Sequence, residues 1–145
     1  MYDDILLPTD ASAGTAAAVS HASELATTYD ATVHVLSVMD TRNRFESPSS
    51  GIASDAWNDA ERERAEDAVR ETAASLPARL TTEEVVRSGV PRTVILEYAE
   101  EAGVDMIVMG THGRTGLDHY LIGSVTEKVV RRSPVPVVSV RPSDD

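Results

Sequence analysis

The chain has 145 residues, of which 41% are hydrophobic, and it carries 13 Lys and Arg against 24 Asp and Glu, a net charge of −11. A chain of this length buries roughly 70% of the surface that its unfolded form exposes, which suffices for one core, so we expect residues 1–145 to form a single domain. The absence of Cys excludes disulfides, thiolate metal sites and cysteine nucleophiles.

The acidic charge and the lack of long apolar runs argue against two further classes of protein. Nucleic-acid binding needs a cationic stripe to meet the phosphates, and the basic residues form none. No apolar run approaches the ~20 residues that cross a bilayer, and the acidic start is unlike a secretory leader, so we expect a cytoplasmic protein without membrane insertion. Lys128 is the only lysine, which suggests adaptation to concentrated salt, with ordinary acidic drift as the alternative.

The first half of the chain predicts two strands and two helices. Residues 5–7 form a short buried strand that is closed by a turn at residues 8–10. Ser12 is placed to cap the next helix, whose apolar face is expected to carry Ala18, Ala22, Leu25 and Tyr29. Residues 33–39 are apolar and β-branched, which predicts a second strand, whereas residues 40–54 lack periodicity and predict a long, mobile connection. Residues 55–76 form a charged amphipathic helix.

The second half continues the alternation of strands and helices. Residues 82–87 predict a third strand, and Pro91 suits the first turn of a helix that ends near Gly103. Residues 105–110 contain a continuous apolar run, typical of a strand that is covered on both faces. After a glycine-rich stretch, residues 124–132 predict a short helix and residues 135–140 a fifth strand. This order predicts a parallel sheet wrapped by helices, and ligands bind such sheets beyond the carboxyl ends of the strands, where the strand order reverses.

The glycine-rich stretch of residues 110–124 carries the functional signal. Glycines let the main chain approach a ligand closely and adopt positive φ, so that successive N–H groups converge on an anion. The helix start at residues 123–125 adds unpaired N–H groups and about half a positive charge. Two such corners suit a polyphosphate, with Ser124 and Thr126 as hydroxyl donors and Arg114 as a cation. Plain loop chemistry is the alternative interpretation of the glycines.

The spacing Gly110-x2-Gly113-x9-Gly123-Ser124 resembles the signature G-x2-G-x9-G-[S/T] of the nucleotide-binding branch of the universal stress protein family. The resemblance covers the whole chain, since the matching segments follow in order at residues 5–10, near Val38, and at 109–113, 123–127 and 134–137. It implies a three-layer α/β/α fold with five parallel strands in the order 3-2-1-4-5. This arrangement is Rossmann-like, of the adenine nucleotide alpha hydrolase-like type.

The resemblance also implies a pocket for ATP or another adenine nucleotide. Asp10 is expected to bind the ribose hydroxyls, or Mg²⁺ or Mn²⁺ beside the phosphates, with a plain turn as its alternative. Val38 is expected to meet adenine through its backbone N–H and C=O, while His112 has a binding or loop-ordering role. The sugar, the floor of the cleft and the phosphates are assigned to Pro8, Thr9, Met109, Gly110, Thr111, Gly113, Arg114, Gly123, Ser124, Val125 and Thr126.

Motifs for other nucleotide or hydrolytic chemistries are missing. There is no G-x4-G-K-[S/T] loop, dinucleotide fingerprint or G-x-S-x-G elbow, which disfavours a P-loop NTPase, a dehydrogenase and a serine hydrolase. The histidines show no metal-ligand spacing, and Asp118 with His119 fits exposed loop polarity better than a metal site. No residue is an evident base for an attacking water, so we expect ATP hydrolysis to be slow or incidental.

The last strand predicts an assembly. Its β-forming residues are Val135, Val137, Val138 and Val140. An open edge at this strand would invite aggregation, and the resemblance implies that the last strands of two protomers pair in a two-fold homodimer. In the alternative, Pro134, Pro136 and Arg141 guard the edge of a monomer. We therefore expect an ATP-binding, homodimeric stress-response regulator with a client protein; the rivals are a nucleotide-free dimerisation module and a weak ATPase or phosphotransferase.

Overall fold

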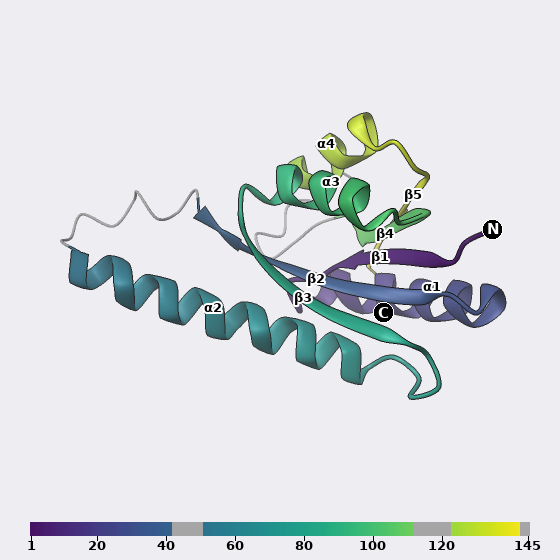
Figure 1. The fold of residues 1–145 in the computed structure, drawn as a ribbon, viewed down its shortest axis with the longest axis horizontal. Helices are drawn as coiled ribbons and strands as arrows, with labels where there is room; N and C mark the ends of the chain where they lie inside the picture. Colours follow the sequence, from purple (N-terminus) through teal and green to yellow (C-terminus); the bar gives the residue numbers. More distant parts are fainter. Residues whose placement is uncertain (42–50, 112–122, 143–145) are drawn as a thin grey trace.

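The computed structural model describes residues 1–41, 51–111 and 123–142, in which five strands alternate with four helices (Figure 1). The strands are β1 (Asp4–Pro8), β2 (Thr32–Asp40), β3 (Thr82–Gly89), β4 (Met106–Gly110) and β5 (Val137–Val140). The helices are α1 (Ala13–Tyr29), α2 (Gly51–Ala74), α3 (Pro91–Ala102) and α4 (Ser124–Arg132). All strands pair in parallel in the order β3-β2-β1-β4-β5, which confirms the order expected from the sequence.

Two helices cover each face of the sheet, which gives the expected three-layer, Rossmann-like arrangement (Figure 1). Because side chains alternate along a strand, Ile5 and Leu7 pack on the side of α1 and α2, whereas Leu6 packs on the side of α3 and α4. All three side chains are fully buried. The central strand is therefore apolar along its whole middle, as parallel sheets require.

Proline and glycine residues set the bounds of α3. Pro91 occupies its first turn, where a missing N–H costs nothing, and Gly103 ends it in the left-handed conformation with φ 64°. Gly89 precedes α3 with φ 145°, and a Cβ at this position would lie 2.7 Å from the Cγ2 of Val94. The entry into α3 therefore requires glycine on both conformational and steric grounds.

The start and end of α1 differ from the sequence expectation. Ser12 occupies the N-cap position, but its hydroxyl makes no capping hydrogen bond. Asp10 fixes the turn that leads into the helix, because its Oδ1 accepts hydrogen bonds from the Ser12 N–H and from the Thr15 hydroxyl. Tyr29, expected on the buried face, is 42% exposed and packs edge-to-face against Tyr2, since it lies in the last turn of the helix.

Two further bounds also differ. α2 begins at Gly51, within the predicted connection of residues 40–54, because a single turn is too short for apolar periodicity to show. Residues 42–50 of that connection lie outside the described residues. β5 begins at Val137 rather than at residue 135, because Pro136 cannot donate to a strand ladder. In the described part of the chain, no helix has the length and apolarity needed to cross a bilayer.

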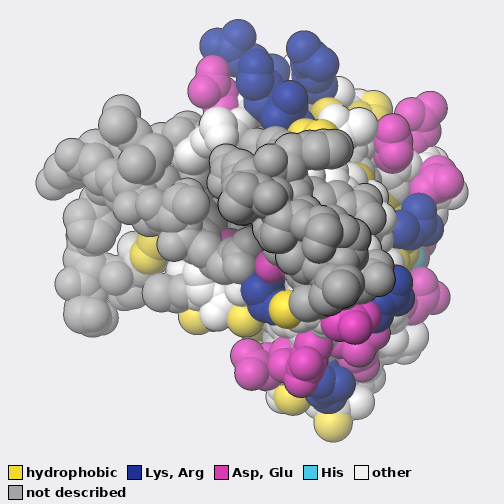
Figure 2. Space-filling model, turned by 90° about the vertical axis from the view of Figure 1, so that its left-hand side faces the viewer, with side chains coloured by type: hydrophobic (Ala, Val, Ile, Leu, Met, Phe, Trp, Pro, Cys, Tyr) yellow, Lys and Arg dark blue, Asp and Glu magenta, His cyan; other side chains and the backbone are white. Residues whose placement is uncertain are grey.

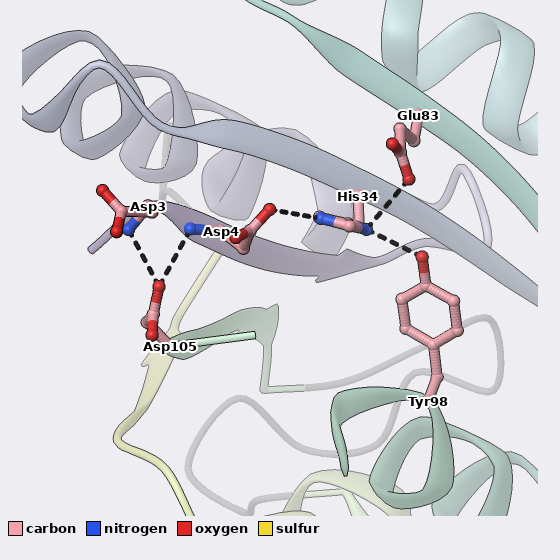
Figure 3. A network of polar contacts seen from close by, with 6 residues as sticks. All are labelled: Asp3, Asp4, His34, Glu83, Tyr98 and Asp105. Carbon is pink, nitrogen blue, oxygen red and sulfur yellow. Dashed lines mark hydrogen bonds and ion pairs between the residues drawn. The ribbon is translucent and has the colours of Figure 1, made fainter. Parts of the chain in front are cut away.

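A polar network joins the amino-terminal parts of three strands to α3 (Figure 3). The buried His34 of β2 lies 2.9 Å from Asp4 Oδ1 through Nε2 and 2.7 Å from the Tyr98 hydroxyl through Nδ1. Because a carboxylate only accepts, Nε2–H donates to Asp4, and in the neutral ring Nδ1 accepts the Tyr98 proton. Glu83 of β3 lies 3.4 Å from the same Nδ1. The network ties the part of α3 around Tyr98 to the amino-terminal parts of the strands.

We expect Tyr98→Phe to lower the free energy of unfolding by about 1 kcal/mol at pH 7, because it removes one buried hydrogen bond. Burial raises the pKa of Tyr98, the Glu83 carboxylate raises it further, and the Arg87 guanidinium opposes both. The folded pKa therefore exceeds the unfolded value of about 10, so the wild type keeps this contribution below pH ~10 and loses it as the pH rises through the folded pKa.

Urea unfolding between pH 7 and 11 checks this expectation. The difference between wild type and Tyr98→Phe narrows above pH ~10, and the exposed Tyr29 supplies the control, since Tyr29→Phe is expected to change stability by less than about 0.5 kcal/mol. A difference that stays constant over the whole range would contradict the assigned role of burial.

Candidate functional site

A cleft of about 220 Å³ opens at the carboxyl ends of β1, β2 and β4. The strand order reverses between β1 and β4, which is where open α/β sheets bind their ligands. Figure 2 views the molecule from the side on which β1 and β2 end. The cleft is lined by Pro8, Thr9, Asp10, Thr15, Leu36, Val38, Asp40, Arg64, Pro91, Ile95, Met109, Gly110, Gly123, Ser124, Val125 and Thr126.

The structure brings ten of the fourteen sequence-predicted residues into this wall: Pro8, Thr9, Asp10, Val38, Met109, Gly110, Gly123, Ser124, Val125 and Thr126. Thr111 was expected there too, but it is buried and does not line the cleft. Its backbone is engaged in joining elements, since its N–H donates to Val140 O at 3.1 Å and its carbonyl accepts from Gly123 N–H at 2.7 Å. His112, Gly113 and Arg114 lie outside the described residues.

Asp10 lies in the tight turn between β1 and α1. Its Oδ1 accepts hydrogen bonds from the Ser12 N–H at 2.9 Å and the Thr15 hydroxyl at 3.2 Å. Ala11 adopts a positive φ of 61°, and its N–H donates to the Thr9 hydroxyl at 3.0 Å. Asp10 therefore stabilises this turn, and its side chain also lines the cleft.

Val38 presents its peptide groups at the point where β1 has ended. The Thr9 N–H donates to Leu36 O at 2.8 Å, so the peptide groups of Leu36 face β1. Alternate residues of a strand direct their N–H and C=O groups towards the same neighbour. Those of Val38 therefore point past Pro8 into the cleft that Val38 lines. One donor and one acceptor thus lie beside apolar side chains, those of Leu36, Ile95 and Met109.

The amino end of α4 closes the opposite part of the cleft. Gly123 is the N-cap residue in an extended conformation, without a side-chain cap. The Thr126 hydroxyl donates to Gly110 O at 2.8 Å and so fixes the first turn of α4 against the end of β4. The first amides of an α-helix have no carbonyl partner within the helix, and the helix dipole adds partial positive charge there. This end of the cleft is suited to an anion.

Six of the lining residues were not predicted from the sequence: Thr15, Leu36, Asp40, Arg64, Pro91 and Ile95. Asp40 ends β2, and its position at the carboxyl end of a strand is a signal that could have identified it. Arg64 comes from the middle of α2, which the sequence predicts only as a charged amphipathic helix. No spacing rule marks it, because its ion pair with Glu61 has the same separation along the helix as that of Arg70 with Asp67.

Metal ligands are sparse in the described part of the chain. It contains no group of three or more His, Asp or Glu side chains that could hold a metal ion. The carboxylates that line the cleft belong to Asp10 and Asp40. One or two carboxylates fit Mg²⁺ when phosphate oxygens complete its coordination. The residues present therefore fit a cation that arrives with a phosphorylated ligand rather than a preformed metal centre.

The fold and the cleft define a doubly wound α/β protein with an open cleft at the switch point of its sheet. Residues 1–141 match the universal stress protein family, and the chain belongs to this family. Its relative MJ0531 from Methanocaldococcus jannaschii, also a universal stress protein, is 35% identical over 148 residues, which cover 97% of this chain and 83% of the relative.

Solved structures agree with this assignment. The structure of MJ0577 is 31% identical with a TM-score of 0.82 and covers 100% of this chain and 99% of its own. The universal stress protein UspA from Lactobacillus plantarum is 27% identical with a TM-score of 0.80, over 97% and 98% of the two chains. A universal stress protein in complex with cAMP is 26% identical with a TM-score of 0.63, over 98% of both chains. The family and fold expected from the sequence are confirmed.

Replacing Thr126 by Val is expected to lower the free energy of unfolding by about 1 kcal/mol, because Gly110 O loses its hydroxyl donor while the side-chain shape is kept. Thr28→Val is the matched control, since the Thr28 hydroxyl also donates to a backbone carbonyl, that of Glu24, but at an exposed position. We expect it to change stability by less than about 0.5 kcal/mol. Equal effects of the two changes in urea unfolding would contradict a role for Thr126 in fixing α4.

Proposed function

We propose that the cleft binds an adenine nucleotide, ATP above all, and that the protein acts in stress response as a nucleotide-dependent homodimeric regulator in the cytoplasm. The observation that carries the proposal is the placement of three kinds of group in one cleft. The first is an apolar wall beside the peptide groups of Val38. The second is the carboxylate of Asp10, in the turn after β1. The third is the amino end of α4, at the opposite part of the cleft. These groups match the base, the ribose and the phosphates.

The apolar wall explains how the base is held. Leu36, Ile95 and Met109 offer flat apolar surface, and the Val38 N–H and C=O supply one donor and one acceptor. Adenine has an amino donor beside a ring-nitrogen acceptor, so a donor and an acceptor on one residue match its edge. Ligand sites are commonly built in this way, with mostly apolar walls and a few oriented polar groups. A relative crystallised in complex with cAMP supports an adenine nucleotide as the ligand.

The phosphate end relies on main-chain groups. Ser124, Val125 and Thr126 form the first turn of α4, and their amides with the helix dipole favour an anion. Asp10 is placed to accept from ribose hydroxyls or to hold Mg²⁺ or Mn²⁺ that accompanies the phosphates. Gly113 and Arg114 complete this end in the proposal, by virtue of their place in the family signature. A weak ATPase or phosphotransferase is the rival function, and a single-turnover assay with ATP would detect it.

We expect ATP to bind saturably in calorimetric titration and Ser124→Asp to weaken this binding at least tenfold. Ser124 is exposed in the first turn of α4, and a carboxylate there repels phosphates while it suits the helix dipole by about 0.3–1 kcal/mol. The melting temperature is therefore not lowered, and adenosine, which lacks phosphates, binds as in the wild type.

The exposed Ser20 of α1 provides the matched control, because Ser20→Asp adds the same charge away from the cleft. The Ser20→Asp variant is expected to bind ATP with the affinity of the wild type. Absence of saturable ATP binding at millimolar concentration in the wild type would contradict the proposed function and favour a nucleotide-free interaction module.

We also propose that two copies pair through β5. This strand ends the sheet order and pairs only with β4 among the described strands. Pro136 O and Val140 O accept from the N–H groups of Ile107 and Thr111 on the β4 side, so the peptide groups of residues 137 and 139 face outwards. Two such edges related by a two-fold axis satisfy one another and leave neither open.

Sedimentation of the wild type is expected to give a dimer and that of Ser139→Pro a monomer. Proline removes an outward N–H and leaves the ladder to β4 intact, because Ser139 faces away from that strand. Circular dichroism should show that the variant keeps its fold. A monomeric wild type, or a variant that remains dimeric, would contradict pairing through this edge.

A further inference from the structure

The guanidinium of Arg64 is held in the wall of the cleft by two partners. Its Nε and Nη2 donate to the carboxylate of Glu61, one turn earlier on α2, at 3.2 and 2.9 Å. Nη2 also donates to the carbonyl oxygen of Val38 at 3.4 Å. Both charged side chains are mostly buried, with exposed fractions of 24% for Arg64 and 18% for Glu61. A planar guanidinium that is anchored on two sides has a defined orientation.

The third nitrogen of the Arg64 guanidinium, Nη1, takes part in neither of these contacts. It is shielded from solvent and has no hydrogen-bond partner among the described residues. Buried polar groups of native proteins are nearly always hydrogen-bonded, so an orphaned donor in a ligand cleft indicates an acceptor on the ligand. Its location favours the base as that ligand group. Val38 lies at the apolar part of the cleft, and the charge of Arg64 is already paired with Glu61 rather than offered to phosphates.

We propose that Arg64 is a base-recognition residue whose Nη1 donates a hydrogen bond to N7 of adenine, an inference that rests on the proposed function. The amino group of adenine lies between the ring acceptors N1 and N7. The Val38 carbonyl accepts from this amino group and the Val38 N–H donates to N1. Nη2 anchors the guanidinium beside that carbonyl, which brings Nη1 to the N7 side. A carbonyl oxygen has two lone pairs and accepts from Nη2 and the amino group together.

The same arrangement predicts selection against guanine. Guanine carries the O6 acceptor where adenine carries its amino donor. Its O6 would therefore face the Val38 carbonyl, another acceptor, and repel it. Arg64 strengthens the binding of N7, which both purines share, while the Val38 carbonyl discriminates between them. The affinity for adenine nucleotides then depends on Arg64, and the preference for adenine depends on the backbone.

Calorimetric titration with ATP and with 7-deaza-ATP, in which N7 is replaced by C–H, tests the proposal. We expect the wild type to bind ATP about tenfold more tightly than 7-deaza-ATP, the factor that one hydrogen bond to a charged donor typically supplies. Arg64→Met should bind the two nucleotides equally, because it lacks the donor that distinguishes them. Arg64→Lys should also lose the preference, because an ammonium cannot bind Val38 and the base as a fork does.

Arg70→Met is the matched control on the same helix. Arg70 pairs with Asp67 at the same spacing as Arg64 with Glu61, but its side chain is 63% exposed. This variant is expected to retain both affinities and the tenfold preference. Arg64→Met alone would leave the mostly buried Glu61 carboxylate without its ion-pair partner. The double change Glu61→Gln with Arg64→Met avoids this unpaired charge. The comparison of the two nucleotides in the wild type needs no substitution, so equal binding would overturn the inference even if the Arg64 variants fail to fold.

Each outcome separates this inference from the proposed function. Equal binding of ATP and 7-deaza-ATP by the wild type overturns the role of Arg64 and leaves the nucleotide site standing. An Arg64→Met protein that keeps the tenfold preference overturns it as well, because the donor to N7 then lies elsewhere. A wild type that binds neither nucleotide overturns the proposed function together with the inference.

Discussion

The end of β1 at Pro8 is the constraint on which the cleft depends. Pro8 pairs with Leu36, whereas β2 continues to Asp40, so the last part of β2 has no partner on the side of β1. Peptide groups that would otherwise complete a ladder border the cleft instead, and the Val38 carbonyl accepts a hydrogen bond from Arg64 there. The turn at Asp10 prevents β1 from extending further along β2, because it directs the chain into α1.

Thr111 connects the cleft with the outer edge of the sheet. One residue accepts from the Gly123 N–H, at the start of α4, and donates to the Val140 carbonyl, at the end of β5. The helix end proposed for phosphates and the strand proposed for dimer pairing are thus both fixed to the backbone of one residue. From the sequence, Thr111 was expected at the nucleotide. The structure shows that its backbone also forms this junction, which only the three-dimensional pairing of β4 with β5 reveals.

The strands and helices were predictable because their signals are local, whereas the strand order was implied by the family resemblance. Apolar runs, caps and proline positions gave all five strands, and the bounds of α4 agree at both ends. The wall of the cleft was predictable where the glycine signature marks it and not where a helix is turned towards it. Arg64 and Arg70 share one helix and one ion-pair spacing, yet the first lines the cleft and the second is exposed. The rotation of α2 against the sheet decides between them, and that rotation is set by tertiary packing rather than by sequence spacing.

The distribution of positive charge explains why a glycine signature, rather than a basic cluster, is the informative motif. The chain carries a net charge of −11, and the Arg64 charge in the cleft is paired with Glu61. Basic side chains gather on the α4 side of the molecule (Figure 2), where Arg131 and Arg132 occupy the last turn of the helix. They complement the negative end of its dipole and leave the positive end to main-chain amides. In the proposed complex the phosphates therefore contact oriented main-chain N–H groups. These groups require no additional basic side chain, only a backbone that can approach the phosphates closely.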